Sequence, residues 1–273
     1  RPRKEVMQHM MHENLGLITS RIIKGGQYCH TFVTKNITDA ALLAANTASS
    51  SYIFPLYLYE QKDKPKKHSF GATMMLFEPH ADYLKKKPNL SPELMEHLVI
   101  AFNKKPAPEE IFYYIYAVLY SNTYRTKYAE FLKIDFPRIP FTKDYMLFKT
   151  MSEYGNKLVD LHLLKSSKLD QPVARFQGKG DNRVEKLMYD SKAELLYIND
   201  TQYFEGIKPE VFEYQIGGYQ VCDKWLKDRK DRTLSLEEIQ TYCRIATAIE
   251  NTIKIQDRID AVYQQTEKDT VRI

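Results

Sequence analysis

The sequence has few of the features on which several protein classes depend. Only three cysteines occur among 273 residues, Cys29, Cys222 and Cys243, and such an odd, widely spaced set argues against a disulfide-stabilised fold. The longest uninterrupted apolar run, Ile111 to Tyr120, has half of the ~20 residues that a membrane span requires. No signal peptide opens the chain. We therefore expect a cytoplasmic protein with reduced thiols.

Motifs for nucleotide binding and covalent catalysis are also missing. The sequence contains no Gly-x-x-x-x-Gly-Lys-Ser/Thr loop, no Gly-x-Gly-x-x-Gly, no Gly-x-Ser-x-Gly and no Cys-x-x-Cys. No Pro-Pro pair occurs, so the Asn/Asp-Pro-Pro-Tyr/Phe signature of amino-methyltransferases is missing too. Because the chain begins Arg1-Pro2-Arg3 without an initiator methionine, we interpret it as a fragment of a longer polypeptide whose other motifs lie upstream.

The composition is that of a folded globular protein. Apolar residues make up 43% of the chain and aromatic residues 12%, which argues against disorder. The net charge of +5 is too small to indicate nucleic-acid binding by itself. Most of the aromatic residues are tyrosines, 20 in all, and these suit half-exposed surfaces and grooves.

We expect residues 1–70 to be rich in β-structure. After a short helix at 5–13, two β-prone stretches flank Gly25-Gly26, and glycine favours the positive φ of a tight hairpin turn. A later strand contains Pro55, which predicts a sheet edge or a bulge. The predicted strands are 15–23, 28–34 and 51–59.

The region 71–170 is predicted to be mainly helical. Ser91-Pro92 has the pattern of a helix start. The helix expected at 109–121 is apolar on all sides and therefore buried, so its aromatic residues are interpreted as core rather than as base-stacking groups. Two further helices are predicted at 122–132 and 143–165.

Residues 171–215 return to β-structure, and 216–273 are predicted to be helical. Four short strands are expected at 173–177, 184–189, 194–198 and 202–204. Ser235 and Glu238 match a capping box, and the apolar residues behind them recur every three or four positions, as in a long amphipathic helix. The fold class predicted is α+β, with mixed β-sheet regions, interspersed helices and a long C-terminal amphipathic helix.

Three stretches carry a combined pattern in a fixed order. The first comprises Arg1 to Met7, Asn14 to Thr19 and Phe54 to Tyr59; the second, Tyr116 to Ser121, Tyr124-Arg125, Tyr128-Ala129 and Phe131 to Pro140; the third, Tyr214 to Val221 and Lys224 to Arg229. Together they cover almost the whole chain. They resemble the C-terminal specificity region, or target recognition domain, of type ISP restriction-modification enzymes and their methylase-helicase relatives.

The resemblance implies that residues 1–273 form one recognition domain of a longer polypeptide. That polypeptide would carry a nuclease, an ATP-driven translocase, a coupler and an N6-adenine methyltransferase. The domain would read an asymmetric sequence in double-stranded DNA and position the target adenine for the methyltransferase upstream. Its partners would be the DNA and the methyltransferase and coupler domains, not a membrane. No catalysis and no cofactor are expected in this fragment; S-adenosylmethionine, ATP and Mg²⁺ would serve the parent enzyme.

Base edges are read by side chains such as arginine and glutamine, and affinity comes from cations on phosphates. The predicted hairpin and a run of small polar residues at 46–51 are the first candidate loops, although an ordinary exposed hairpin and a plain connecting loop remain open. The turn at 177–183 is a third candidate, and the helix start at 122–127 suits backbone positioning or contact with the methyltransferase. The predicted DNA contacts are Arg21, Lys24, Gln27, Tyr28, His30, Asn46, Ser50, Asn122, Arg125, Lys127, Lys179, Asn182 and Arg183.

Other readings stay open. The chain could be a coupling scaffold that does not read bases, or a metal-dependent nuclease built on Asp190-Ser191-Lys192 and Asp228-Arg229-Lys230. We interpret those triplets as solvated turns. His9 and His12, one helical turn apart, lack a third metal ligand. The lysine runs at 62–67 and 85–87 are interpreted as solvated faces.

Overall fold

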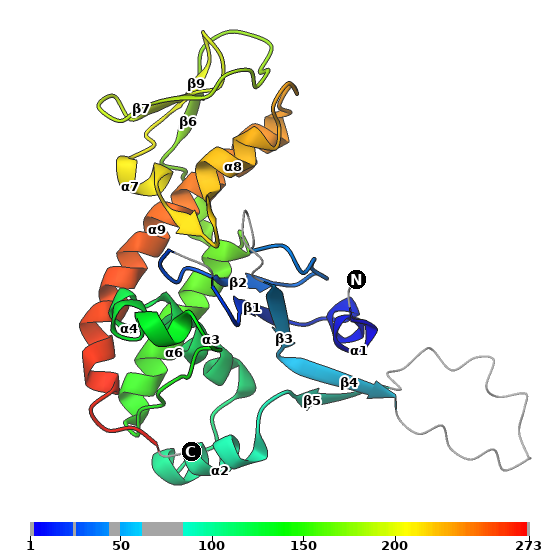
Figure 1. The fold of residues 1–273 in the computed structure, drawn as a ribbon, viewed down its shortest axis with the longest axis vertical. Helices are drawn as coiled ribbons and strands as arrows, with labels where there is room; N and C mark the ends of the chain where they lie inside the picture. The colour runs from blue at the N-terminus through cyan, green and yellow to red at the C-terminus, as the bar shows by residue number, and fades with distance from the viewer. Residues whose placement is uncertain (1–2, 24–25, 44–49, 62–83, 272–273) are drawn as a thin grey trace, which may run out of the picture.

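The computed structural model describes residues 3–23, 26–43, 50–61 and 84–271 (Figure 1). Several small antiparallel sheets are interspersed with helices, so the predicted α+β class is confirmed. None of the helices in these ranges combines the length and the apolar character that a transmembrane span needs.

The N-terminal sheet has three strands in the order β2-β1-β3. The central strand β1 (Gly16–Ser20) pairs antiparallel with β2 (Thr31–Thr34) and with β3 (Ser51–Pro55), which is an edge strand, as Pro55 predicts. A short helix, α1 (Lys4–Met7), and the 3₁₀ turn η1 (Gln8–Met11) precede the sheet. The predicted tight turn is wrong, because the pairing of β1 with β2 ends at Thr19 and Thr31, and the eleven residues between them, 20–30, are far more than a two-residue turn spans.

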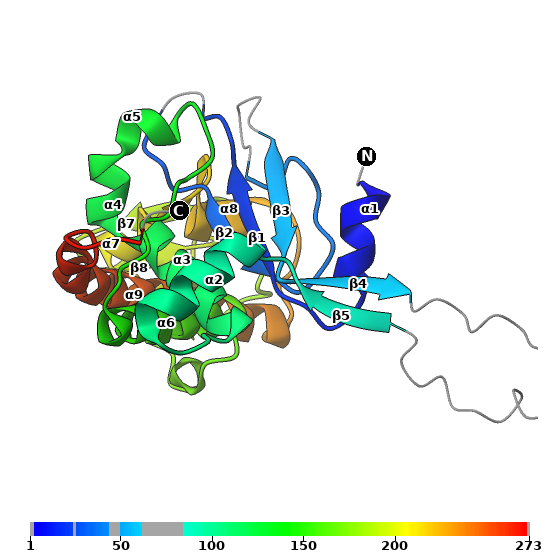
Figure 2. The same ribbon diagram turned by 90° about the horizontal axis from the view of Figure 1, so that it is seen from below.

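A two-stranded ribbon extends from the body of the molecule (Figures 1 and 2). It consists of β4 (Tyr57–Gln61) and β5 (Leu84–Pro88), which pair antiparallel. The predicted strand at 51–59 is therefore divided, since Leu56 turns the chain from one sheet to the next. The lysines at 85–87 are exposed, as expected, whereas the run at 62–67 lies outside the described residues.

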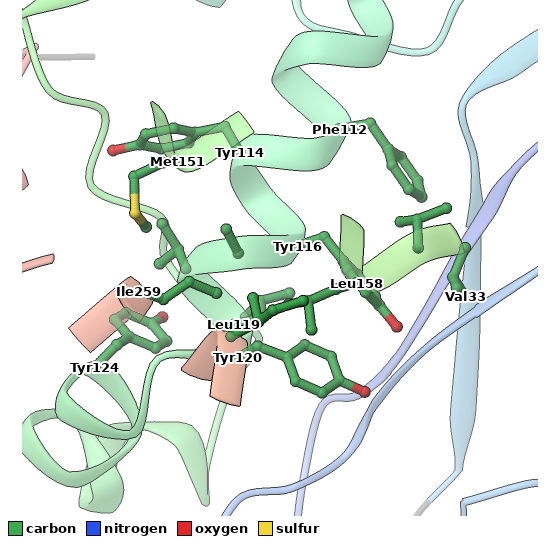
Figure 3. Packing of buried hydrophobic residues seen from close by; sticks show 14 of the residues in the cluster. Val33, Phe112, Tyr114, Tyr116, Leu119, Tyr120, Tyr124, Met151, Leu158 and Ile259 are labelled. Carbon is green, nitrogen blue, oxygen red and sulfur yellow. The ribbon is translucent and has the colours of Figure 1, made fainter. Parts of the chain in front are cut away.

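The middle of the chain forms a helical core around one buried helix. Eight residues of α3 are buried, and Phe112, Tyr114, Tyr116 and Tyr120 lie inside the cluster shown in Figure 3, so their predicted role as core is confirmed. Tyr113 is only partly buried and packs against the cluster. The predicted helix at 122–132 is interrupted at Tyr128, whose backbone leaves the helical region. The helices here are α2 (Pro92–Phe102), α3 (Pro108–Tyr120), α4 (Asn122–Lys127), α5 (Ala129–Leu132) and α6 (Tyr145–His162).

Helices α3 and α6 approach unusually closely at one glycine. A Cβ atom on Gly155 of α6 would lie 1.8 Å from the carbonyl oxygen of Tyr113 in α3. No side chain can occupy that position unless the helices move apart.

The C-terminal part is built on a four-stranded sheet with the order β6-β9-β8-β7, at the top of Figure 1. The four predicted strands therefore all exist, although each is only three residues long. A small hairpin and two helices follow. These elements are η2 (Ser167–Asp170), β6 (Arg175–Gln177), β7 (Met188–Asp190), β8 (Leu195–Tyr197), β9 (Tyr203–Glu205), α7 (Pro209–Phe212), β10 (Gln215–Ile216), β11 (Tyr219–Gln220) and α8 (Val221–Lys227).

The long helix α9 (Leu236–Thr266) joins two hydrophobic cores. Its first half packs into the core of the C-terminal sheet through Ile239 and Tyr242, and its second half completes the core around α3 through Ile259 and Tyr263 (Figures 1 and 3). The capping box is formed: Ser235 Oγ accepts from the Glu238 amide, and the Glu238 carboxylate accepts from the Ser235 amide.

Candidate nucleic-acid interface

The connection from β1 to β2 has an exposed and a buried portion. Arg21 and Gln27 are exposed, while Tyr28 and His30 are only 2% and 4% exposed. This burial argues against the predicted contact of Tyr28 and His30 with a DNA groove. Lys24 lies outside the described residues. Of the five candidates in this connection, Arg21 and Gln27 keep a surface position.

Tyr28 is buried because its hydroxyl group bridges two strands. It forms hydrogen bonds of 2.7 Å with Thr19 Oγ1 and 2.9 Å with Thr31 Oγ1, and burial raises its pKa. Burial, followed by the positive charge of Arg125, lowers the pKa of His30 to about 4. These two side chains anchor the connection to the sheet, so that Arg21 and Gln27 are presented from a fixed base.

Arg21 is held beside a second segment of the chain. Its Nε lies 3.3 Å from Asp135 Oδ1, and its guanidinium lies 5.9 Å from the centre of the Phe136 ring. The ion pair is exposed, so it contributes little to stability and an incoming acceptor can compete for the guanidinium.

The β10–β11 hairpin links the β1–β2 connection to residues 42–43, which precede the second candidate loop. The Gly217 amide donates to Cys29 O at 3.0 Å, and the Tyr219 hydroxyl donates to Leu42 O at 2.7 Å. Gly217 has a φ of +64°, and a Cβ atom there would lie 2.6 Å from Leu43 O, so glycine is required at this junction. The second loop ends at the exposed Ser50, and Asn46 lies outside the described residues.

Residues 122–127 form their hydrogen bonds with the protein interior and with side chains of α9 and its C-cap. Arg125 is 7% exposed, and its Nε donates to Leu119 O at 2.6 Å, which argues against the predicted DNA contact by Arg125. The Thr123 amide already donates to Asp260 Oδ1 at 2.9 Å, where a phosphate was expected to bind. Asn122 and Lys127 are exposed but bonded to Gln256 and Glu267, and their contact with DNA stays a prediction.

The third candidate loop lies against the turn that precedes α9. The Val184 amide donates to Arg232 O, and the Leu234 amide donates to Asn182 O. Asn182 is also fixed by Gln202, whose Nε2 donates to Asn182 Oδ1 at 2.7 Å. The exposed cations Lys179 and Arg183 thus project from a rigid turn.

Sequence reasoning missed two cations that the fold adds to this loop. Lys230 and Arg232 lie in the turn paired with 182–184, and both are exposed. The run Asp228 to Arg232 looks like a solvated turn in the sequence, and no spacing rule connects it with Lys179, some fifty positions earlier. A β-bridge between Arg183 and Thr233 brings the two segments together.

The nuclease and metal readings find no support in the described ranges. Asp190 Oδ1 accepts from the amides of Lys192 and Ala193, as in an ordinary turn. His9 Nδ1 accepts from the Tyr59 amide. No group of three or more His, Cys, Asp or Glu side chains in those ranges could hold a metal ion, so we assign no metal chemistry to them.

Comparison with known proteins gives one family and several similar structures. The family model described as Type ISP C-terminal specificity domain matches residues 1–258. No curated protein matches the chain. The ATP-dependent Type ISP restriction-modification enzyme LlaBIII bound to DNA is 20% identical with a TM-score of 0.63, over 96% of this chain and 16% of that one.

Two other solved structures are similar. A nuclease-deletion mutant of the Type ISP restriction-modification enzyme LlaGI, in complex with a DNA substrate mimic, is 20% identical with a TM-score of 0.56, over 91% of this chain and 21% of that one. The DrdV–DNA complex is 16% identical with a TM-score of 0.64, over 98% of this chain and 26% of that one. The chain therefore spans about a quarter or less of these proteins, and at these identities the likeness is one of fold.

Proposed function

The chain belongs to the family of type ISP C-terminal specificity domains, and on that premise we propose that it recognises a specific sequence in double-stranded DNA. The observation that carries the proposal is the arrangement at the β1–β2 connection. Arg21 and Gln27 are exposed, on a segment anchored at Tyr28 and His30 and joined by the β10–β11 hairpin to residues 42–43. Arginine suits guanine O6 and N7, and glutamine suits adenine N6 and N7.

In the proposed complex the N-terminal sheet and the C-terminal sheet have different tasks. The β1–β2 connection reads base edges in the major groove, and Lys179, Arg183, Lys230 and Arg232 contact phosphates. The whole chain acts as one recognition unit that positions an adenine for a methyltransferase elsewhere in the polypeptide. Catalysis, and the use of S-adenosylmethionine, ATP and Mg²⁺, belong to other domains of that cytoplasmic enzyme.

Selection of bound duplexes from a random pool tests the proposal. We expect one sequence to be enriched, and Arg21→Ala and Gln27→Ala each to weaken binding to it by about 5–150-fold, because each bidentate contact is worth about 1–3 kcal/mol. Binding to random duplex should change much less. The measurement is the ratio of specific to random affinity at fixed salt.

Arg258→Ala and Gln264→Ala serve as matched controls, because both side chains are exposed on α9 and belong to the same residue types. They should bind the enriched duplex like the unmodified chain. Enrichment of no sequence would contradict the proposed function and favour the coupling scaffold. Enrichment that Arg21→Ala and Gln27→Ala leave unaltered would refute the assignment of these two residues alone.

The proposed phosphate contacts can be detected separately, through the salt dependence of DNA affinity. We expect Lys179→Ala with Arg183→Ala to reduce the slope of log affinity against log salt by up to about 1.8, because each phosphate contact on duplex DNA contributes about 0.9. Affinity should fall equally for enriched and random duplexes, since backbone contacts carry no sequence information. The pair Lys149→Ala with Lys157→Ala, exposed on α6, is the control. A slope that changes equally in both pairs would contradict the assignment.

A further inference from the structure

Two isoleucines stand out beside the proposed reading residues. Ile22 is 51% exposed and Ile134 is 68% exposed, although they lie more than a hundred positions apart in the sequence. Single exposed apolar residues are common on protein surfaces. These two are of interest because they lie beside Arg21, which is proposed to read a base edge.

The chain geometry places the two isoleucines on neighbouring segments. Arg21 contacts Asp135, and the Ile23 amide donates to Lys133 O at 3.0 Å. These two contacts bring residues 21–23 alongside residues 133–135, the segments that carry Ile22 and Ile134.

The pair cannot turn inward to bury itself. The next residue, Ile23, already fills the space in the core, where it is 5% exposed. The hydrogen bond to Lys133 O and the Arg21–Asp135 ion pair fix the backbone on both sides of Ile22. Ile22 and Ile134 are therefore exposed apolar residues on two adjoining segments, beside the Arg21–Asp135 pair.

We propose that Ile22 and Ile134 contact thymine 5-methyl groups in the major groove, an inference that rests on the proposed function. The methyl group of thymine is the apolar group that a base pair displays in that groove, next to the polar edges that Arg21 and Gln27 suit. The pair would thus add preference for A·T pairs beside the positions read by hydrogen bonds.

A protein partner fits a different part of this surface better. An apolar cavity of about 380 Å³ opens nearby, between the N-terminal sheet, α3 and the segment 136–139. Its walls include Phe54, Phe112 and Phe136, a lining suited to an apolar side chain of another protein. Ile22 and Ile134 do not line this cavity. They share their segment with Arg21 and Gln27 instead, which favours DNA as their partner.

The test combines removal of the methyl groups with removal of the isoleucines. In the enriched duplex, each thymine is replaced in turn by uracil, which lacks the methyl group but keeps the hydrogen-bonding edge. For the unmodified chain we expect about a fourfold loss of affinity at one or two positions, the value of one buried methyl group. In the variant with Ile22→Ala and Ile134→Ala, the same replacements should have no effect. Both substitutions are at exposed positions, so the variant is expected to fold.

The control is Ile100→Ala, which removes an isoleucine that is 78% exposed on α2 and should keep the full response to uracil. Specific binding without any response to uracil, or with an equal response in the double variant, would overturn the inference and leave the proposed function standing. An enriched sequence without an A·T pair would overturn it too. Enrichment of no sequence would overturn both. Loss of binding to another domain of the polypeptide, with unaltered DNA binding, would show that the isoleucines serve a protein interface.

Discussion

Replacing Gly155 with alanine is expected to lower the free energy of unfolding by at least about 3 kcal/mol, the upper end of the usual cost of overpacking. The added Cβ atom would lie 1.8 Å from the carbonyl oxygen of Tyr113, and that backbone atom cannot turn aside as a flexible side chain can. The helices α3 and α6 would have to separate, and both contribute buried residues to the larger core. Urea denaturation, followed by circular dichroism, measures the change.

Asn156→Ala is the control for this substitution. Asn156 is the next residue of α6 and is exposed, so its replacement should change the free energy of unfolding by no more than about 0.5 kcal/mol. Equal effects of the two substitutions would contradict the close approach of α3 and α6.

The second large effect is a loss of stability at acidic pH. The free energy of unfolding is expected to fall by about 4 kcal/mol between pH 7 and pH 5, because His30 and His162 are buried in their neutral forms. Burial, followed by the charge of Arg125, lowers the pKa of His162 to about 3 and that of His30 to about 4. His162 satisfies both ring nitrogens as a neutral ring, 2.7 Å from the Tyr116 hydroxyl and 2.9 Å from Thr252 Oγ1.

The loss of stability in acid follows from the different proton affinities of the folded and unfolded states. In the unfolded chain a histidine has a pKa of about 6.5, so below that pH the unfolded state binds protons that the folded state does not. Stability is therefore fully present above pH 6.5 and declines as the pH falls towards the folded values. At pH 5 each histidine accounts for about 2 kcal/mol, or 1.36 kcal/mol for each of 1.5 pH units.

Substitutions separate the contribution of the buried histidines from other effects of low pH on stability. His162→Asn should reduce the difference in unfolding free energy between pH 7 and pH 5 to about half. The same replacement at His12, which is exposed, should leave the difference unaltered. An undiminished difference in His162→Asn would show that this ring is not held neutral.

Local sequence rules predicted the features of the fold that depend on the residues of one helix or strand alone. The capping box at Ser235, the edge position of Pro55 and the burial of the aromatic helix α3 all follow from spacing and residue type. These features depend on neighbours within one element, so the sequence contains the information needed. The same holds for the four short strands of the C-terminal sheet, which turn residues delimit.

The candidate site was predicted less well, because exposure depends on distant partners. Tyr28 and His30 look like groove residues in the sequence, yet Thr19 and Thr31 and the neighbouring helices enclose them. Arg125 looks like a phosphate ligand, yet it donates to a carbonyl group in the core. The contacts between residues 21–23 and residues 133–135 join segments that no local periodicity relates.

The division of α9 between two cores has a consequence for biosynthesis. The core around α3 and α6 draws most of its residues from positions before 170, but Ile255, Ile259 and Tyr263 complete it. A ribosome that has reached residue 170 has therefore made a nascent chain in which the apolar surface that α9 covers is still exposed. That core can close only after residue 263 has been translated, so products that terminate before α9 expose this surface to chaperones and proteases.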